Sequence, residues 1–199
     1  MMFGRTALLS LLCLTFQLPA QQPAAPPHGA HDAATSGLNK EMIKDITPAD
    51  FIKLSEKEKA VSITLVAVWS AANYGMNFNG YSHGKLSYNV PTGWTVEVKF
   101  INPSPVPHSA MVVERDMTRK LQMGEPYFDG GSVPNPAQGM SFKKAEFSFL
   151  ADEAGEYALT CGFPAHAISG HWVSLNVMDD LKVPTIQLGE AGEVKEAVK

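Results

Sequence analysis

One cysteine and two histidines stand at equal spacing on one short segment of this chain. Cys161 is followed by His166 and His171, with four residues between each pair, and His108 lies far upstream. A soft thiolate with imidazoles binds transition metals, either redox-active copper in a trigonal plane with a weak axial donor or zinc in a tetrahedron. The spacing therefore predicts one mononuclear metal site formed by His108, Cys161, His166 and His171.

The N-terminus is typical of an export signal. Arg5 precedes a short apolar run, Ala7 to Phe16, and Leu18 to Ala20 offer a cleavage point, so residues 1–20 are predicted to be a signal peptide. The alternative is a retained anchor, although the run is shorter than the ~20 residues that span a bilayer. We expect a periplasmic or otherwise extracytoplasmic protein with no stable membrane span after leader cleavage.

Cys161 becomes the single cysteine of the exported chain, because Cys13 lies within the predicted leader. In an oxidising compartment it then has no disulfide partner within its own chain. A buried, inert thiol is one interpretation. The adjacent His166 and His171 favour the other interpretation, a metal-bound thiolate.

The composition is that of a folded, mildly acidic domain. Hydrophobic residues make up 45% of the chain and charged residues 18%, and the formal net charge is −4. Leader cleavage removes one arginine and no acid, which gives −5. Nucleic-acid binding requires a basic face, so no nucleic-acid partner is expected.

Short alternating segments predict the strands that must hold these side chains. Residues 94–101 place Trp94, Val96, Val98 and Phe100 on one face, and six further segments have the texture of strands. These segments cover residues 61–68, 85–90, 110–113, 141–150, 156–160 and 172–177. We predict an all-β antiparallel sandwich, in which strand ends and one tight loop hold the four metal-binding side chains.

The flanking segments are predicted to lie outside this domain, which is placed at residues 61–184. Residues 21–40 are read as a flexible linker whose His28 and His31 are incidental. Residues 41–60 are read as an N-terminal helical extension that starts at Thr47 and Pro48. Residues 185–199 are read as a loosely attached C-terminal tail. The long segment 116–139 is expected either to shield the site or to present a surface to a partner.

Several blocks of the sequence resemble sulfocyanin, a blue-copper family of the cupredoxin superfamily. They are Met76 to Gly80, Pro91 to Trp94, Pro107 to Ser109, and Cys161 to Trp172. The resemblance implies a cupredoxin Greek-key β-sandwich, one mononuclear copper centre and electron transfer outside the cytoplasm. It also implies redox partner proteins such as cytochromes or terminal oxidases.

The resemblance assigns the equatorial ligands to His108, Cys161 and His166, but the axial methionine of the family falls at His171. Histidine is a stronger donor to Cu(II) than a thioether, so coordination by His171 should lower the reduction potential and shift the colour from blue toward green or red. The alternative is that His171 points away from the metal. Ala165 replaces a glycine that is usual before the second histidine, and we expect little effect from that change.

Residues beside the ligands suggest smaller contributions. Ser109 is placed to hydrogen-bond the cysteine sulfur or the facing loop, unless it is an ordinary strand serine. Phe163, Pro164 and Ala165 could form an apolar collar around His166 that suits transient docking, although plain packing explains them as well. His83 is expected to be a surface residue of a turn.

Three functions are compatible with these residues. We favour an exported electron carrier that is not an enzyme. A copper centre that binds or reduces a small ligand such as nitric oxide or nitrite is the second, although the sequence offers no evident general acid, general base or second copper site. A metal-storage protein or a zinc site is the third.

Overall fold

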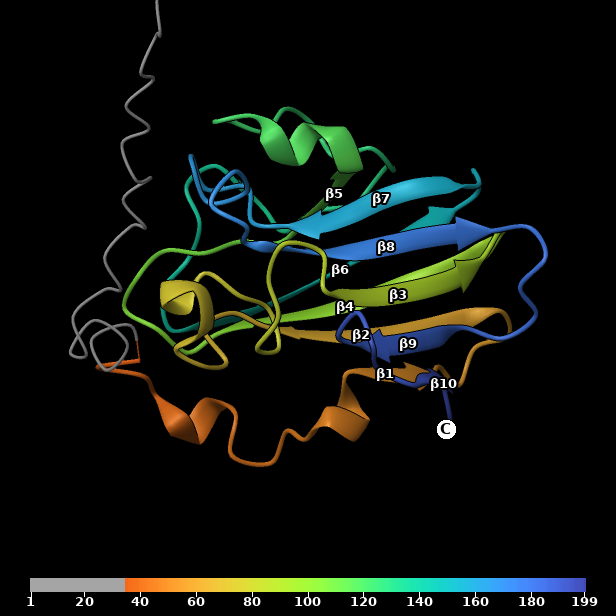
Figure 1. Cartoon of the computed structure of the whole chain (residues 1–199), viewed down its shortest axis with the longest axis horizontal. Helices are drawn as coiled ribbons and strands as arrows, with labels where there is room; N and C mark the ends of the chain where they lie inside the picture. The colour runs from red at the N-terminus through yellow and green to blue at the C-terminus, as the bar shows by residue number, and fades with distance from the viewer. Residues whose placement is uncertain (1–34) are drawn as a thin grey trace, which may run out of the picture.

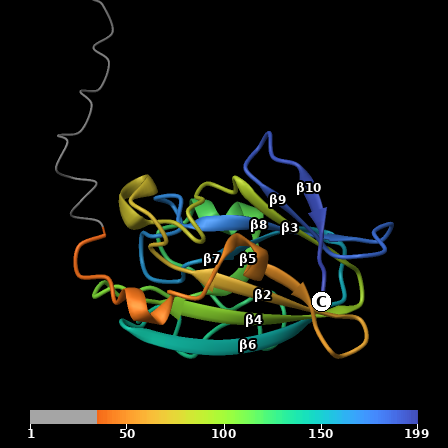
Figure 2. The same cartoon turned by 90° about the horizontal axis from the view of Figure 1, so that it is seen from below.

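Two β-sheets packed face to face form the body of the protein (Figures 1 and 2). The computed structural model describes residues 35–199. One sheet has the strand order β1-β2-β4-β6, and the other has the order β10-β9-β3-β8-β7-β5. The strands are β1 Ile52–Leu54, β2 Ala60–Val66, β3 Leu86–Pro91, β4 Trp94–Asn102, β5 Met111–Glu114, β6 Lys143–Ala151, β7 Gly155–Thr160, β8 Trp172–Met178, β9 Thr185–Leu188 and β10 Val194–Glu196. Short 3₁₀ turns cover Lys40–Met42, Pro48–Asp50, Ala72–Gly75 and Arg115–Arg119.

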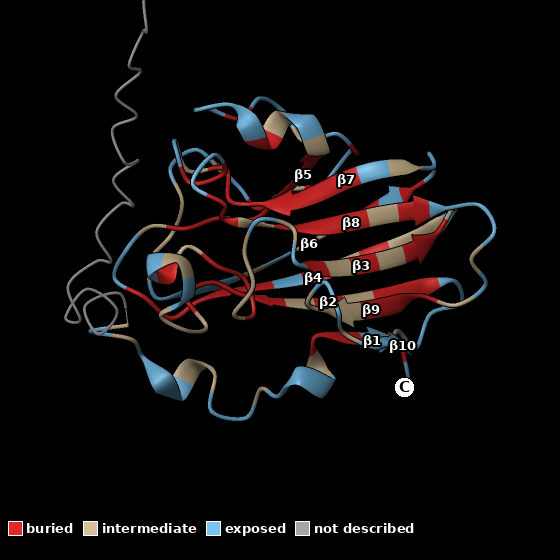
Figure 3. Cartoon of the chain, viewed as in Figure 1, coloured by how far each residue is buried: buried red, intermediate tan, exposed pale blue. Residues whose placement is uncertain are grey.

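Alternation along the strands builds the core between the sheets. In β4, Val96, Val98 and Phe100 are buried, whereas Glu97 and Lys99 between them lie on the outer face. Tyr88 and Leu175 enter the same core from the other sheet, and Figure 3 shows the buried stretches along the central strands. Removing this apolar surface from water stabilises the sandwich. The predicted all-β sandwich is confirmed, and each predicted strand is present with its ends displaced by one or two residues at most. The sheets are mixed and not purely antiparallel as predicted, because β2 pairs parallel with β4 and β3 pairs parallel with β8.

The predicted N-terminal helix is wrong. Pro48–Asp50 forms a single 3₁₀ turn, and Ile52–Leu54 forms strand β1, which pairs antiparallel with β2. The expected helix start is present, because the Asp50 carboxylate accepts 2.8 Å hydrogen bonds from the Thr47 N–H and hydroxyl. The helix does not continue because Phe51 and Ile52 are buried against the core, where an edge strand satisfies their backbone.

The C-terminal segment belongs to the second sheet and is not a loosely attached tail. β9 pairs antiparallel with β3, β10 pairs with β9, and the Leu54 N–H donates to the Val198 carbonyl at 2.9 Å. Ile186 and Ala197 are buried. The segment therefore covers the edge of β3 and connects the two sheets at the β1 side.

The long segment between β5 and β6 runs beside residues 108–112, which include His108. The Val112 N–H donates to the Gly131 carbonyl at 2.8 Å, and the Val133 N–H donates to the Ala110 carbonyl at 3.0 Å. His108 and Met140 then exchange backbone hydrogen bonds of 3.2 and 2.8 Å. These contacts hold the segment against the chain that carries His108.

Residues 35–199 contain no helix of the length and apolarity that a bilayer-crossing helix requires.

Candidate metal centre

The four predicted metal-binding side chains meet at one end of the sandwich. Cys161 directly follows β7, His171 directly precedes β8, and His108 lies between β4 and β5. One nitrogen from each histidine and the Cys161 sulfur all lie within 4.8 Å of one another. All four residues are buried, and His166 is the most exposed of them at 8%. Chain segments more than fifty residues apart thus supply donors to one point.

Backbone hydrogen bonds fix the loop that supplies three of the four donors. The Cys161 N–H donates to the His171 carbonyl at 3.0 Å, which closes the loop at its base. Within the loop, the His166 N–H donates to the Phe163 carbonyl at 3.1 Å, and the His171 N–H donates to the His166 carbonyl at 3.0 Å. The spacing of four residues therefore corresponds to a compact loop with internal hydrogen bonds.

Ala165 has a left-handed backbone conformation, with φ of +67°. This region favours glycine, because a side chain there costs about 1–2 kcal/mol. The Ala165 N–H donates to the Leu121 carbonyl of the long segment at 2.6 Å, and this contact holds the turn. The replacement of glycine is therefore a backbone strain at the loop tip.

Two donors from Ser109 approach the cysteine sulfur. The Ser109 N–H donates to Cys161 Sγ at 3.3 Å, and its hydroxyl lies 3.7 Å from the same atom. The hydroxyl oxygen also accepts a 2.8 Å hydrogen bond from the Gly162 N–H. Ser109 therefore makes both of the contacts considered from the sequence. It contacts the Cys161 sulfur, and it hydrogen-bonds Gly162 of the loop that carries the cysteine.

Burial keeps all three histidines in the neutral form that binds metals. Burial, together with the nearby His166, lowers the pKa of His108 to about 3. Burial also lowers the pKa of His166, and that of His171 well below its usual value, with a weaker opposing effect from the Asn77 backbone. The pKa of the Cys161 thiol is raised by burial, against which the hydrogen bonds from Ser109 act.

Several ring nitrogens of the cluster lack hydrogen bonds. His108 Nδ1 and both nitrogens of His171 are buried without a hydrogen-bond partner in the described part of the chain. An unpaired buried polar atom is costly, so such atoms usually have a partner. One thiolate and up to three neutral imidazoles fit a single copper ion, which would take up lone pairs that the protein leaves free.

Phe78, which belongs to the Met76 to Gly80 block, also lies at this cluster. The Phe78 ring packs against the His171 ring, with a centroid distance of 4.3 Å and an interplanar angle of 43°. In the sequence, the block from Met76 to Gly80 contributed to the family resemblance, but it predicted no role for Phe78 at the metal site. His83 is exposed on a turn, as expected, and its ring lies over Gly170. His28 and His31 lie outside the described residues.

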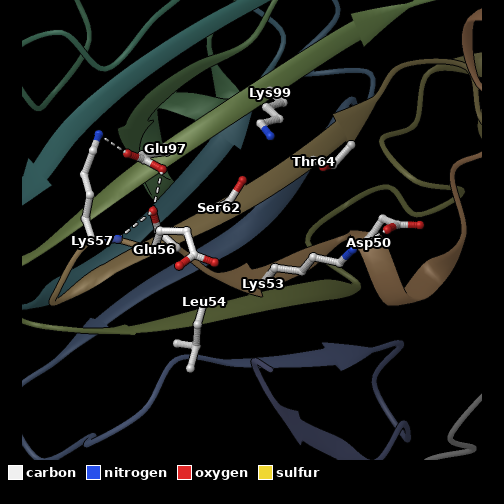
Figure 4. A pocket seen from close by; sticks show the side chains of 10 residues that line it. Asp50, Lys53, Leu54, Glu56, Lys57, Ser62, Thr64, Glu97 and Lys99 are labelled. Carbon is white, nitrogen blue, oxygen red and sulfur yellow. Dashed lines mark hydrogen bonds and ion pairs between the residues drawn. The ribbon is translucent and has the colours of Figure 1, made fainter. Parts of the chain in front are cut away.

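A large surface groove lies away from the cluster. A groove of about 430 Å³ crosses the outer face of β1, β2 and β4 (Figure 4). It contains the ion pairs Lys53–Asp50 and Lys57–Glu97, at 2.7 and 2.6 Å. None of the four cluster residues lines this groove, so it offers no substrate pocket beside the metal centre.

Comparisons with known proteins identify the family of this chain. The chain matches the sulfocyanin (SoxE) domain family over residues 48–187. Sulfocyanin of Sulfolobus acidocaldarius is 34% identical over 139 residues, which are 65% of this chain and 69% of that protein.

Solved structures of blue-copper proteins are also similar. Auracyanin A of Chloroflexus aurantiacus has a TM-score of 0.42 and 20% identity, over 60% of this chain and 99% of that one. Rusticyanin from Thiobacillus ferrooxidans has a TM-score of 0.35 and 18% identity, over 65% of this chain and 89% of that one. The family match covers all four cluster residues and shows that the chain belongs to the sulfocyanin family of blue-copper cupredoxins, whose cofactor is copper.

Proposed function

We propose that the protein is an exported carrier of single electrons, in which His108, Cys161 and His166 hold one copper ion and His171 is the fourth donor. The observation that carries this proposal is the convergence of the four donor atoms within 4.8 Å at a buried point. Copper bound there supplies a one-electron Cu(II)/Cu(I) couple. A site for electron transfer needs no substrate pocket, and the groove of Figure 4 is lined by other residues.

The protein prepares the donors before metal binds. The three imidazoles are neutral near pH 7 because their pKa values are lowered, so no proton must leave them. The Cys161 thiol must lose its proton, and the Ser109 N–H and hydroxyl stabilise the sulfur as its charge develops. A cage fixed by backbone hydrogen bonds also reduces the rearrangement that accompanies a change of oxidation state.

Electrons would enter and leave at the edge of His166. This ring is the most exposed of the four, and Phe163 lies 4.7 Å from it between ring centroids. Ile168 and Leu121 on the neighbouring surface are 48% and 68% exposed. These apolar side chains around His166 lose their contact with water easily when another protein docks. Such a surface suits transient binding of a redox partner protein, such as a cytochrome or a terminal oxidase.

His171 distinguishes this site from the methionine pattern of the family. Its side chain is fully buried and aims a nitrogen into the cluster, and neither nitrogen has a hydrogen bond within the described residues. These observations favour the coordinating role over a ring that points away. A stronger fourth donor favours Cu(II), so the potential should be lower than with methionine at this position.

The test of the proposed function is metal analysis and visible spectroscopy of the protein purified from its native source. We expect one copper per chain and an intense thiolate-to-Cu(II) band that a mild reductant bleaches reversibly. A colourless protein that holds zinc would contradict the proposal. A spectral change on anaerobic addition of nitric oxide or nitrite would instead indicate a centre that binds small ligands.

The proposed location outside the cytoplasm is tested on the same preparation. The predicted leader, residues 1–20, lies outside the described residues. The mass of the mature chain should correspond to cleavage near residue 20, and cell fractionation should place the protein outside the cytoplasm. A full-length chain in the membrane fraction would support the retained anchor.

A further inference from the structure

The chain between β2 and β3 makes an excursion at the metal end of the sandwich (Figure 1). Asn73, Tyr74 and Asn79 of this excursion have positive φ, between 49° and 54°. Such a conformation costs Tyr74 about 1–2 kcal/mol, whereas asparagine adopts it more readily, and it persists where the surroundings determine the path of the chain. The Asn73 side chain also donates a 2.8 Å hydrogen bond to the Ser169 carbonyl, which belongs to the loop of residues 161–171 that carries Cys161, His166 and His171.

The side-chain amide of Asn77 holds the first half of this path. Its Nδ2 donates to the carbonyls of Ser70 and Ala72, at 2.9 and 2.7 Å, and its Oδ1 accepts from the Gly80 N–H at 3.1 Å. Asn77 is fully buried. Because the Asn77 end of each bond is buried, loss of a partner would leave its amide group unsatisfied, which is costly.

The side-chain amide of Asn79 fixes the second half to the core. Its Oδ1 accepts from the Val66 N–H at 2.7 Å, and its Nδ2 donates to the Thr64 carbonyl and the Tyr88 hydroxyl at 2.8 and 3.0 Å. Phe78 stands between the two anchored asparagines, so its backbone has little freedom.

Phe78 places its ring between the core and His171. It contacts His171 at a centroid distance of 4.3 Å, and its other neighbour is Phe100, edge-on at 6.3 Å. Both Phe78 and His171 are fully buried. Neither nitrogen of His171 has a hydrogen bond of good geometry in the described residues, and the polar group that acts on this ring is the backbone of Asn77, the neighbour of Phe78. Packing against Phe78 beside this backbone therefore sets the orientation of the ring. A histidine that binds a metal usually has its other nitrogen held by a hydrogen bond, and here the Phe78 ring together with the Asn77 backbone takes that place.

We propose that Phe78, held by Asn77 and Asn79, is a positioning residue for His171: it fixes the ring in the orientation that aims one nitrogen at the copper site. The inference rests on the proposed role of His171 as the fourth donor. The strength of that donor is then set by a segment more than ninety residues away in the sequence. A change at position 78 should alter the copper site without touching any ligand.

The test replaces Phe78 by Leu in the copper-loaded full chain and records the visible and electron paramagnetic resonance spectra and the reduction potential. We expect both spectra and the potential to change in the same direction as in His171→Gln, because a His171 ring that is no longer held in place is a weaker donor to copper. Phe78→Met is the second variant, since it retains more of the core volume and is better tolerated if Phe78→Leu does not fold. The matched control is Phe149→Leu, a buried phenylalanine that stacks on Phe128 instead, which should leave the spectra unchanged.

The double variants identify the cause. In a His171→Gln background, replacement of Phe78 should produce no further spectral shift. An equal shift in that background, or a shift in the Phe149 control, would mean general damage to the core and would overturn the inference. Unchanged spectra for both Phe78 variants, together with a shift for His171→Gln, would overturn the positioning role and leave the fourth donor intact. An unchanged spectrum for His171→Gln would remove the fourth donor, and this inference with it, while copper binding by the other three residues would stand.

Discussion

In the proposed copper site, His171 takes the fourth donor position. The sequence resemblance implies that His108, Cys161 and His166 are the equatorial ligands and that His171 stands where a methionine is expected. The ring is fully buried and contacts His108 at a centroid distance of 4.8 Å. Neither of its nitrogens has a hydrogen bond of good geometry in the described residues, although the Asn77 backbone acts on the ring, so a nitrogen remains available to a metal.

Replacing His171 by Met should raise the reduction potential and make the oxidised protein bluer. The physical reason is that a thioether is a weaker donor to Cu(II), so the reduced state gains relative stability. Redox titration and visible spectroscopy of the copper-loaded variant measure both effects. An unchanged spectrum and potential would show that His171 does not bind the metal.

Ala165 tests the strain at the tip of the metal loop. Ala165→Gly should stabilise the apoprotein by roughly 0.5–1 kcal/mol, because relief of the left-handed strain is partly offset by the greater freedom of glycine in the unfolded chain. Urea unfolding measures the change.

The control for this prediction is Ala167→Gly in the same loop. Ala167 is buried and does not have a positive φ. Its replacement should destabilise the protein, by about 0.5–1 kcal/mol. If Ala165→Gly destabilises the protein as well, the strain at position 165 is not relieved by glycine.

The chain segments that flank the predicted domain form part of the two sheets, whereas the sequence predicted a helical extension and a loose tail. β1 extends the first sheet, and β9 and β10 extend the second. Without β9, the strand β3 would expose its hydrogen-bonding edge, and exposed edges favour aggregation. The same strand β3 pairs with β8, which begins directly after His171, so the edge strands support the sheet that carries the site.

Truncation of a buried side chain in β9 should measure this contribution. Ile186 is 4% exposed, so Ile186→Ala should destabilise the protein by about 2–4 kcal/mol. Val194→Ala, on the neighbouring strand β10 at 54% exposure, is the control and should change the stability by less than about 0.5 kcal/mol. Equal effects of the two variants on chemical unfolding would mean that β9 does not pack on the core as described.

For the whole molecule, the buried histidines make the stability of the apoprotein depend on pH. The pKa of His108 in the folded protein is about 3, and those of His166 and His171 are also lowered. The unfolded chain therefore binds more protons below about pH 6.5, the usual pKa of histidine. The free energy of unfolding is therefore highest above this pH. It decreases as the pH falls from about 6.5 toward the lowered pKa values that the three histidines have in the folded protein.

Between pH 6 and pH 5, the unfolding free energy of the apoprotein should fall, by up to about 1.4 kcal/mol for each of the three histidines. Carboxylates contribute little in this window, since the lowered pKa values of Asp50 and Glu97 act below pH 4.5. Urea unfolding at the two pH values measures the change. A His108→Gln variant should show a smaller slope, and a flat profile for the wild-type apoprotein would contradict the buried neutral histidines.

Sequence patterns were sufficient for the features that local chemistry determines. The central strands are encoded by alternation, as in residues 94–101, because a strand between a core and solvent must alternate. The candidate ligands Cys161, His166 and His171 share one loop, so their spacing was visible directly. His108 could be added only because thiolate–imidazole sites require donors from elsewhere and because the motif around it resembled the family.

The tertiary structure decided what depends on partners distant in the sequence. Residues 52–54 and 185–188 are too short to show a period, and they become strands because β2 and β3 offer them hydrogen-bonding edges. Likewise, no local pattern could reveal that Phe78 faces His171, since that contact exists only after the two sheets pack. The sequence by itself thus determined which donors are present, whereas packing between remote segments determined where their rings point, because side-chain orientation in a buried site is set by the neighbours that surround it.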